Sequence, residues 1–147
     1  METINFNRSE RDFESRIRES FGKQQFMATI GAELTIVSAG EVHIEMPFDM
    51  ALTQQNGYIH AGVITSIVDT ACGFAAYSLM PAGSGVLSVE FKVNLLNPAK
   101  GDRFVAIGKV IKAGRTLTVC SGEVLAIAAG GEKVIAIMQA TMMAILP

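Results

Sequence analysis

A chain of 147 residues is long enough for one domain with its own core, and half of its residues are hydrophobic whereas only 18% are charged. The formal net charge of −2 gives no basic excess, which excludes nucleic acid as an expected partner. So apolar a composition in a small chain predicts that some surface is buried between subunits.

Neither secretion nor a membrane span is expected. The N-terminus has no apolar segment of the kind that directs secretion. Residues 61–80 are long enough to cross a bilayer, but Asp69 lies at their centre and no Lys/Arg cluster flanks them. Cys72 and Cys120 lie in apolar stretches and are predicted to be free core residues, as suits a reducing cytoplasm. We therefore expect a cytoplasmic protein with no membrane partner.

The chain begins with a predicted amphipathic helix over residues 9–24. Ser9 is placed to cap its start and Gly22 to end it. Its apolar face is formed by Phe13, Ile17 and Phe21. We expect this helix to cover a sheet.

Six strands are expected from the alternation of apolar and polar residues. They span residues 32–37, 41–46, 87–95, 103–112, 117–128 and 134–145. Because the turns between the last four are short and rich in glycine, successive strands are predicted to be antiparallel hairpin neighbours. His43 falls on the polar side of its strand and is predicted to be solvated.

A long helix over residues 60–80 is the centre of the predicted fold. Apolar side chains recur along it at helical spacing: Ile64, Ile67, Val68, Ala71, Ala75 and Leu79. Its other faces carry small residues, so we expect it to be buried almost all round and closely approached by other backbone segments. Asp69 is its one charge, and a lone buried carboxylate is costly unless something requires it.

The order of these elements predicts one α+β domain over residues 1–147, with an antiparallel sheet covering one apolar helix. The edges of such a sheet need a partner. A homodimer that continues the sheet would supply it, and a dimer of dimers is a further possibility.

The stretch Gly57-Tyr-Ile-His60-Ala-Gly62, with Asp69 nine residues after the histidine, resembles the hotdog-fold acyl-CoA thioesterases of the phenylacetate-pathway (PaaI-like) family. The similarity continues through the strand pattern over about residues 30–145. It implies a hotdog fold and a site in which Asp69 of one subunit faces the His60 loop of the other.

Within this resemblance, Asp69 is the expected catalytic base or nucleophile, and burial should raise its pKa. The amides of Ala61 and Gly62 open the helix, where free N–H groups can form an oxyanion hole. Each assignment has a structural alternative. Asp69 could instead form hydrogen bonds at a dimer interface, and the Ala61 and Gly62 amides could belong to an ordinary helix start. Ala61 departs from the family's usual glycine.

Gln54 stands where the family usually has asparagine, and Asn56 is the alternative source of that amide. His60 is expected to orient groups or bond the thioester carbonyl, with a structural role equally open. Ser88 is expected on the polar face of its strand near Asp69, with a plain cross-strand contact as the alternative.

Three cations at turns, Lys100, Lys112 and Arg115, are expected either to contact the phosphates of coenzyme A or simply to be solvated. Two histidines and two separated cysteines do not make a usual zinc site, so no metal is expected. No cofactor is expected beyond the coenzyme A of the substrate.

The function implied is hydrolysis of an aryl or medium-chain acyl-CoA to the free acid and CoA. Two alternatives remain open. One is a hotdog dehydratase or hydratase acting on acyl thioesters, and the other is a non-catalytic acyl-CoA-binding protein.

Overall fold

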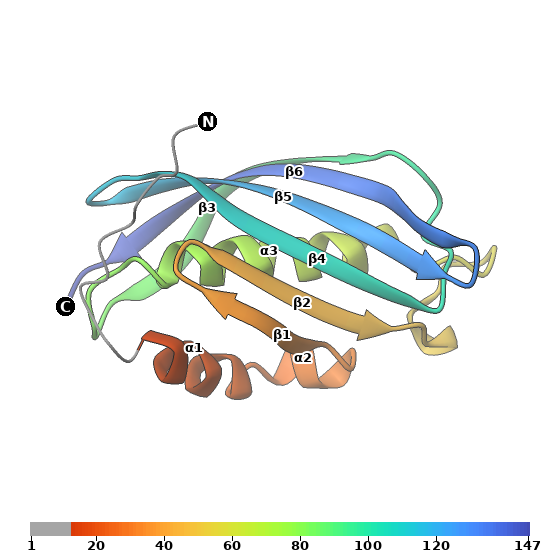
Figure 1. Cartoon of the computed structure of the whole chain (residues 1–147), viewed down its shortest axis with the longest axis horizontal. Coiled ribbons are helices and arrows are strands. Elements are labelled where there is room, and N and C mark those ends of the chain that lie inside the picture. The colour runs from red at the N-terminus through yellow and green to blue at the C-terminus, as the bar shows by residue number, and fades with distance from the viewer. Residues whose placement is uncertain (1–12) are drawn as a thin grey trace.

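One six-stranded antiparallel sheet and one long helix make up most of the computed structural model, which describes residues 13–147 (Figure 1). The sheet order is β1-β2-β4-β5-β6-β3. The elements are α1 (Phe13–Gly22), α2 (Gln25–Thr29), β1 (Glu33–Ser38), β2 (Glu41–Pro47), the 3-10 helix η1 (Met50–Leu52), α3 (Ala61–Tyr77), β3 (Gly85–Leu95), β4 (Arg103–Ala113), β5 (Leu117–Ala128) and β6 (Gly131–Ile145). This is the predicted α+β hotdog fold.

The core lies between α3 and one face of the sheet. Figure 1 shows α3 running along that face, with α1 and α2 beside β1. Five of the six predicted core positions of α3 are buried, and Leu79, which follows the helix, packs partly buried against the core. The stripe that carries Ser66, Asp69 and Gly73 is only half-buried in this chain, so the prediction of a helix buried all round is wrong for one chain alone.

Two glycines let α3 approach the sheet closely. Gly108 on β4 and Gly122 on β5 are paired across the two strands. A Cβ at Gly108 would lie 2.4 Å from the backbone carbon of Ala71, and one at Gly122 would lie 2.6 Å from Cγ2 of Val68. The close approach expected from the small residues of α3 is therefore made possible by the sheet as well as by the helix.

The strand pairing corrects one prediction. The β1–β2, β4–β5 and β5–β6 pairs are hairpins as expected, but β3 pairs with β6 and not with β4. Residues 96–102 cross the end of the β5–β6 hairpin, where Leu96 N–H donates to Ile135 O and Asp102 N–H donates to Ile127 O, each at 2.8 Å. Turn residues mark where a chain leaves a strand, but they do not specify which strand it joins next.

The N-terminal helix agrees with its prediction where the structure describes it. Helix α1 ends at Gly22, and its residues Phe13 and Ile17 are buried. The predicted cap Ser9 lies outside the described residues.

His43 is not freely solvated, contrary to the prediction. Its Nε2 lies 2.7 Å from Oε1 of Glu41, and its side chain is 16% exposed. Both residues are on β2, where residues two apart share one face of the sheet.

A β-bulge at Val89 sets which side chains of β3 face the helix. Ser88 pairs with Met142 and Glu90 pairs with Thr141, so Val89 has no partner on β6. After the bulge, Phe91 lies opposite Ala140 on the helix-facing side, whereas before it Ser88 occupies that side. The prediction that Ser88 shares the polar face with Glu90 is therefore wrong, because the bulge reverses the alternation.

None of the described helices is both long enough and apolar enough to cross a membrane.

Candidate active site

The start of α3 forms the first part of the candidate site. His60 caps the helix, and its Nδ1 accepts a hydrogen bond from Gly62 N–H at 2.8 Å. An imidazole that accepts at Nδ1 while neutral carries its proton on Nε2, which leaves Nε2–H as a donor. The Ala61 N–H makes no hydrogen bond to any group of residues 13–147. Of the two predicted oxyanion donors, Ala61 is therefore free and Gly62 is engaged by His60.

Gln54 holds the loop before α3 in a closed turn. Its Oε1 accepts hydrogen bonds from the backbone N–H groups of Asn56 and Tyr58. Its own backbone N–H donates to Tyr58 O at 2.8 Å, and Gly57 has a φ of 83°, a conformation that favours glycine. Because Oε1 is engaged, the side-chain NH2 is the part of Gln54 that remains for a ligand.

A hollow of ≈400 Å³ lies beside this loop. Gln54 and Ala61 line it, together with apolar side chains such as Ile64 and Ile135. Asn56 is exposed and does not line it. Of the two amides considered for the same role, Gln54 is therefore the one placed to meet a ligand here.

Asp69 forms the second part of the site, on the half-buried stripe of α3. Its Oδ1 accepts a hydrogen bond from Ser88 Oγ at 2.7 Å. Burial raises the pKa of Asp69, and the Ser88 hydrogen bond opposes that rise by stabilising the carboxylate. The pair lines a smaller hollow of ≈100 Å³.

Ser88 reaches Asp69 because of the bulge at Val89. The Ser88 hydroxyl also lies 3.4 Å from Sδ of Met142, its partner across β6. Both contacts require Ser88 on the helix-facing side of β3. The family resemblance predicts that Ser88 lies near Asp69, and the structure confirms this. The strand pattern, however, assigns Ser88 to the face of β3 that points away from the helix, which is wrong.

The two parts of the site are separate within one chain. Asp69 lies eight residues after Ala61 on α3, which at 1.5 Å per residue is about 12 Å along the axis and about 80° around it. They line different hollows. One chain therefore does not place its own Asp69 beside its own helix start.

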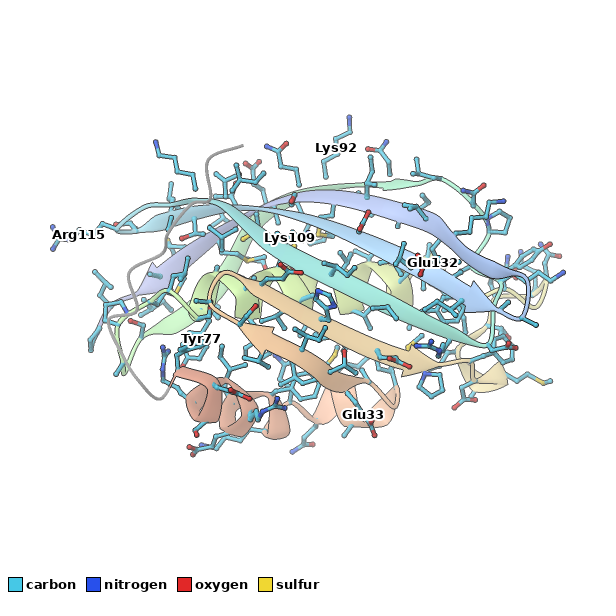
Figure 2. All side chains as sticks on the ribbon, viewed as in Figure 1. Glu33, Tyr77, Lys92, Lys109, Arg115 and Glu132 are labelled. Carbon is cyan, nitrogen blue, oxygen red and sulfur yellow. The ribbon has the colours of Figure 1, made fainter. Side chains whose placement is uncertain are left out.

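The three candidate cations do not gather in one chain. Lys100 lies in the segment that crosses the β5–β6 hairpin, before β4 begins. Lys112 and Arg115 lie at the other end of β4, about 35 Å away at the usual rise of a strand. Figure 2 shows Arg115 at the opposite end of the sheet from Glu132, which belongs to that hairpin. All three side chains are exposed.

The cysteines are buried and free, as predicted. Cys72 Sγ lies 3.6 Å from Ser121 O, and Cys120 Sγ lies 3.5 Å from Cys72 O. Burial raises the pKa of both thiols, that of Cys120 to about 12, so neither is ionised near neutral pH. Within residues 13–147 no three His, Cys, Asp or Glu side chains are grouped to hold a metal ion.

The fold and this arrangement on α3 define a class of protein: the chain belongs to the thioesterase superfamily, whose family model matches residues 56–128. A thioesterase family protein from Silicibacter pomeroyi is 48% identical in sequence, and the match covers 92% of this chain and 99% of that one with a TM-score of 0.90. Human acyl-coenzyme A thioesterase 13 is 33% identical over 92 residues, which are 60% of this chain and 65% of the human protein.

The resemblance to the PaaI-like family is matched in the fold. The PaaI protein of the E. coli phenylacetic acid degradation operon superposes with a TM-score of 0.81 at 18% identity, over 91% of this chain and 94% of that one. These comparisons make the chain a hotdog-fold member of a family of thioester-hydrolysing enzymes.

Proposed function

We propose that this chain hydrolyses acyl-CoA thioesters of aryl or medium-chain acids in sites that two copies of the chain complete. The observation that carries the proposal is the Asp69–Ser88 pair. It places a carboxylate of raised pKa beside a small hollow, on the central helix of a thioesterase-superfamily fold. The similarity to acyl-coenzyme A thioesterase 13 supports coenzyme A as the leaving group.

Asp69 acts in this proposal as a general base. It accepts a proton from water while the water oxygen bonds to the thioester carbonyl carbon. The C–S bond then breaks, and the CoA thiolate leaves and takes up the proton that Asp69 held. Alternatively, the Asp69 carboxylate attacks the carbonyl carbon directly, the C–S bond breaks, and the CoA thiolate leaves and takes up a proton from solvent. Water then hydrolyses the mixed anhydride to the free acid and restores Asp69, which here acts as a nucleophile.

The carbonyl oxygen, which becomes negative during attack, would be held at the start of α3. The free Ala61 N–H points from a helix N-terminus, where the helix dipole favours negative charge. The Nε2–H of His60 and the side-chain NH2 of Gln54 are the further donors of this loop. No metal or cofactor enters these steps, apart from the coenzyme A of the substrate.

A homodimer is part of the proposal because Ala61 and Asp69 are about 12 Å apart along the axis of α3 within one chain. Among residues 13–147, strand β3 is an edge strand with β6 as its one neighbour, and Phe91 is 45% exposed on it. Antiparallel pairing of β3 with its copy would satisfy the free strand edge and cover this side chain. The opposite ends of the two chains would then meet, which brings Lys100 of one copy toward the Arg115 end of the other, where CoA phosphates could bind. A dimer of dimers is compatible with this arrangement.

The proposed test is a panel of acyl-CoA esters, with free thiol as the readout and a chelator present. Release of CoA from an aryl or medium-chain ester without metal is expected. An unsaturated thioester product would instead indicate a dehydratase or hydratase. Activity that depends on added metal would contradict the mechanism.

Binding without turnover is the second candidate function. The observation that favours it is the bond from Gly62 N–H to His60, which leaves one helix amide for an oxyanion instead of two. Acyl-CoA binding measured by calorimetry with no thiol release would select this function.

The free, buried cysteines also support the proposed cytoplasmic location.

A further inference from the structure

A hollow of ≈230 Å³ lies between the end of α3 and the β4–β5 turn, at the opposite end of the molecule from the Gln54 loop (Figure 1). Its apolar lining comes from the segment after α3 and from the end of the chain after β6: Leu79, Met80, Pro81 and Leu146. No residue that lines it also lines the hollow beside Gln54 or the hollow beside Asp69. It is therefore separate from both parts of the candidate active site.

Hydrogen bonds to neighbouring elements fix both walls of this hollow. Met80 N–H donates to Tyr77 O, and Met80 O accepts from the guanidinium of Arg16, each at 3.1 Å. On the other side, Thr116 O in the β4–β5 turn accepts a hydrogen bond from Ala144 N–H of β6 at 2.8 Å. The hollow is therefore preformed between packed elements.

Thr118 brings an unpaired hydroxyl to the hollow. Its side chain is only 3% exposed and lines the hollow, yet its hydroxyl makes no hydrogen bond to any group of residues 13–147. The hydroxyl of Thr70 on α3, in contrast, donates to Ser66 O at 2.8 Å. A buried hydroxyl without a partner is unfavourable. The Thr118 hydroxyl is therefore available to donate to a ligand.

Arg115 brings a positive charge to the same hollow. Its side chain is exposed, lines the hollow and makes no hydrogen bond or ion pair with residues 13–147. The segments that meet here, residues 79–85, 111–118 and 143–147, contain Lys112 and Arg115 but no acidic side chain. A guanidinium forms two parallel hydrogen bonds with a carboxylate. Charge and geometry therefore favour an anion, and a carboxylate in particular.

We propose that this hollow is a binding site for a small aliphatic monocarboxylate. Arg115 and the Thr118 hydroxyl bond the carboxylate oxygens, and the alkyl chain lies against Leu79, Met80 and Leu146. At about 30 Å³ for each water-sized group, ≈230 Å³ has room for about eight non-hydrogen atoms, the size of hexanoate. The inference does not rest on the proposed hydrolysis, since neither Arg115 nor Thr118 acts on the thioester in those steps.

The test is a titration with hexanoate, followed through the methyl signals of the protein in NMR spectra. Hexanoate should shift the signals of Met80 and Leu146 at lower concentration than those of Ile64 and Ile135, which line the Gln54 hollow. Hexan-1-ol has no charge and inorganic phosphate has no alkyl chain. Each should therefore bind at least about threefold more weakly than hexanoate.

Two variants with matched controls test the contacts to the carboxylate. Thr118→Val keeps the shape but removes the hydroxyl, so Kd should rise about two- to tenfold, whereas Thr118→Ser should stay near the wild-type Kd. Arg115→Gln should raise Kd by about fivefold or more. Thr116→Val and Lys112→Gln are the controls, because both residues are exposed and do not line the hollow. Each control should change Kd by less than about twofold.

Equal changes in each variant and its control would overturn the proposal, because they would show a general attraction of anions to this end of the molecule. The absence of methyl shifts at about 50 mM hexanoate would also overturn it. Shifts confined to Ile64 and Ile135 would place the acid in the candidate active site instead. The presence or absence of thiol release from acyl-CoA decides the proposed function and leaves these outcomes unchanged.

Discussion

Strands β5 and β3 carry similar patterns of alternation but have different surroundings. In β5, alternate residues such as Cys120 and Val124 are fully buried, because β4 and β6 flank the strand and α3 lies against it. In β3 the alternation is cleaner, yet Leu87 and Val89 are 52% and 54% exposed. Alternation indicates which side chains favour leaving water. It does not indicate whether the same chain covers them.

The same difference separates the two halves of the proposed site. The turn before α3 is closed by its own hydrogen bonds, whereas Asp69 depends on an edge strand and a bulge. If β3 pairs with a second copy, then the exposed edge of β3 and the incomplete site are both explained by the absence of that copy from a single chain. The variants below test this link, from the largest expected effect to the smallest.

Asp69→Asn should have the largest effect on activity. It keeps the size of the side chain and an acceptor for Ser88 but removes the base, so kcat should fall by about a hundredfold or more. The raised pKa of Asp69 means that its contribution to stability is present at low pH and is lost as the pH rises through that pKa. The variant should therefore melt no lower than the wild type at pH 8. Unchanged kcat in a folded Asp69→Asn dimer would remove Asp69 from the mechanism.

Phe91→Glu should dissociate the dimer. A charge at the β3 edge would be buried against its copy, which should weaken association by at least about thirtyfold and lower activity with it. Ile137→Glu is the control, since Ile137 is 44% exposed, close to the 45% of Phe91, but lies on the inner strand β6. Analytical ultracentrifugation measures both. A Phe91→Glu dimer as tight as the wild type would place the interface elsewhere.

Alanine at the two glycines beneath α3 should destabilise the fold unequally. Gly108→Ala would meet the backbone of α3, whereas Gly122→Ala would meet the movable ends of Val68 and Cys72. We expect losses of about 3 kcal/mol and about 1 kcal/mol in the free energy of unfolding, measured with urea. Equal losses would show that the helix shifts as readily as a side chain does.

Ser88→Ala should have the smallest effect, visible mainly in the pH profile. Its hydroxyl lowers the pKa of Asp69, so its removal lets burial raise that pKa further. Since the base works only when ionised, the acidic limb of the kcat profile should move to higher pH, with rates converging at alkaline pH. Ser121→Ala, on β5, serves as the control. An unmoved acidic limb in Ser88→Ala would mean that this hydrogen bond does not tune the base.

Much of the fold follows from the sequence, because local patterns report local structure. The buried positions of α3 and the span of β5 are predicted directly. The β3–β6 pairing is not, since strand partners distant in the chain leave no local signal. The bulge at Val89 cannot be predicted either, because the alternation of apolar and polar residues continues through Val89 without interruption.

The site was predictable in its residue types more than in its geometry. Asp69 stands out as a lone charge in an apolar helix, and Ser88 was found through the family resemblance. The engagement of Gly62 by His60 depends on the rotamer of a capping side chain, which no spacing reveals. Gln24 lines the same hollow as Asp69 but is not predicted, because nothing local in the sequence relates the start of α2 to the middle of α3.

Mixing two variants, each altered in one half of the site, tests the shared site most directly. Asp69→Asn and Gln54→Ala would be combined under conditions that exchange subunits. If each site takes Asp69 from one copy and the loop from the other, every mixed dimer regains one intact site. An equal mixture should then recover about a quarter of the wild-type rate. If both residues act within one chain, every site keeps one defect, and a mixture no more active than its two components would contradict the shared site.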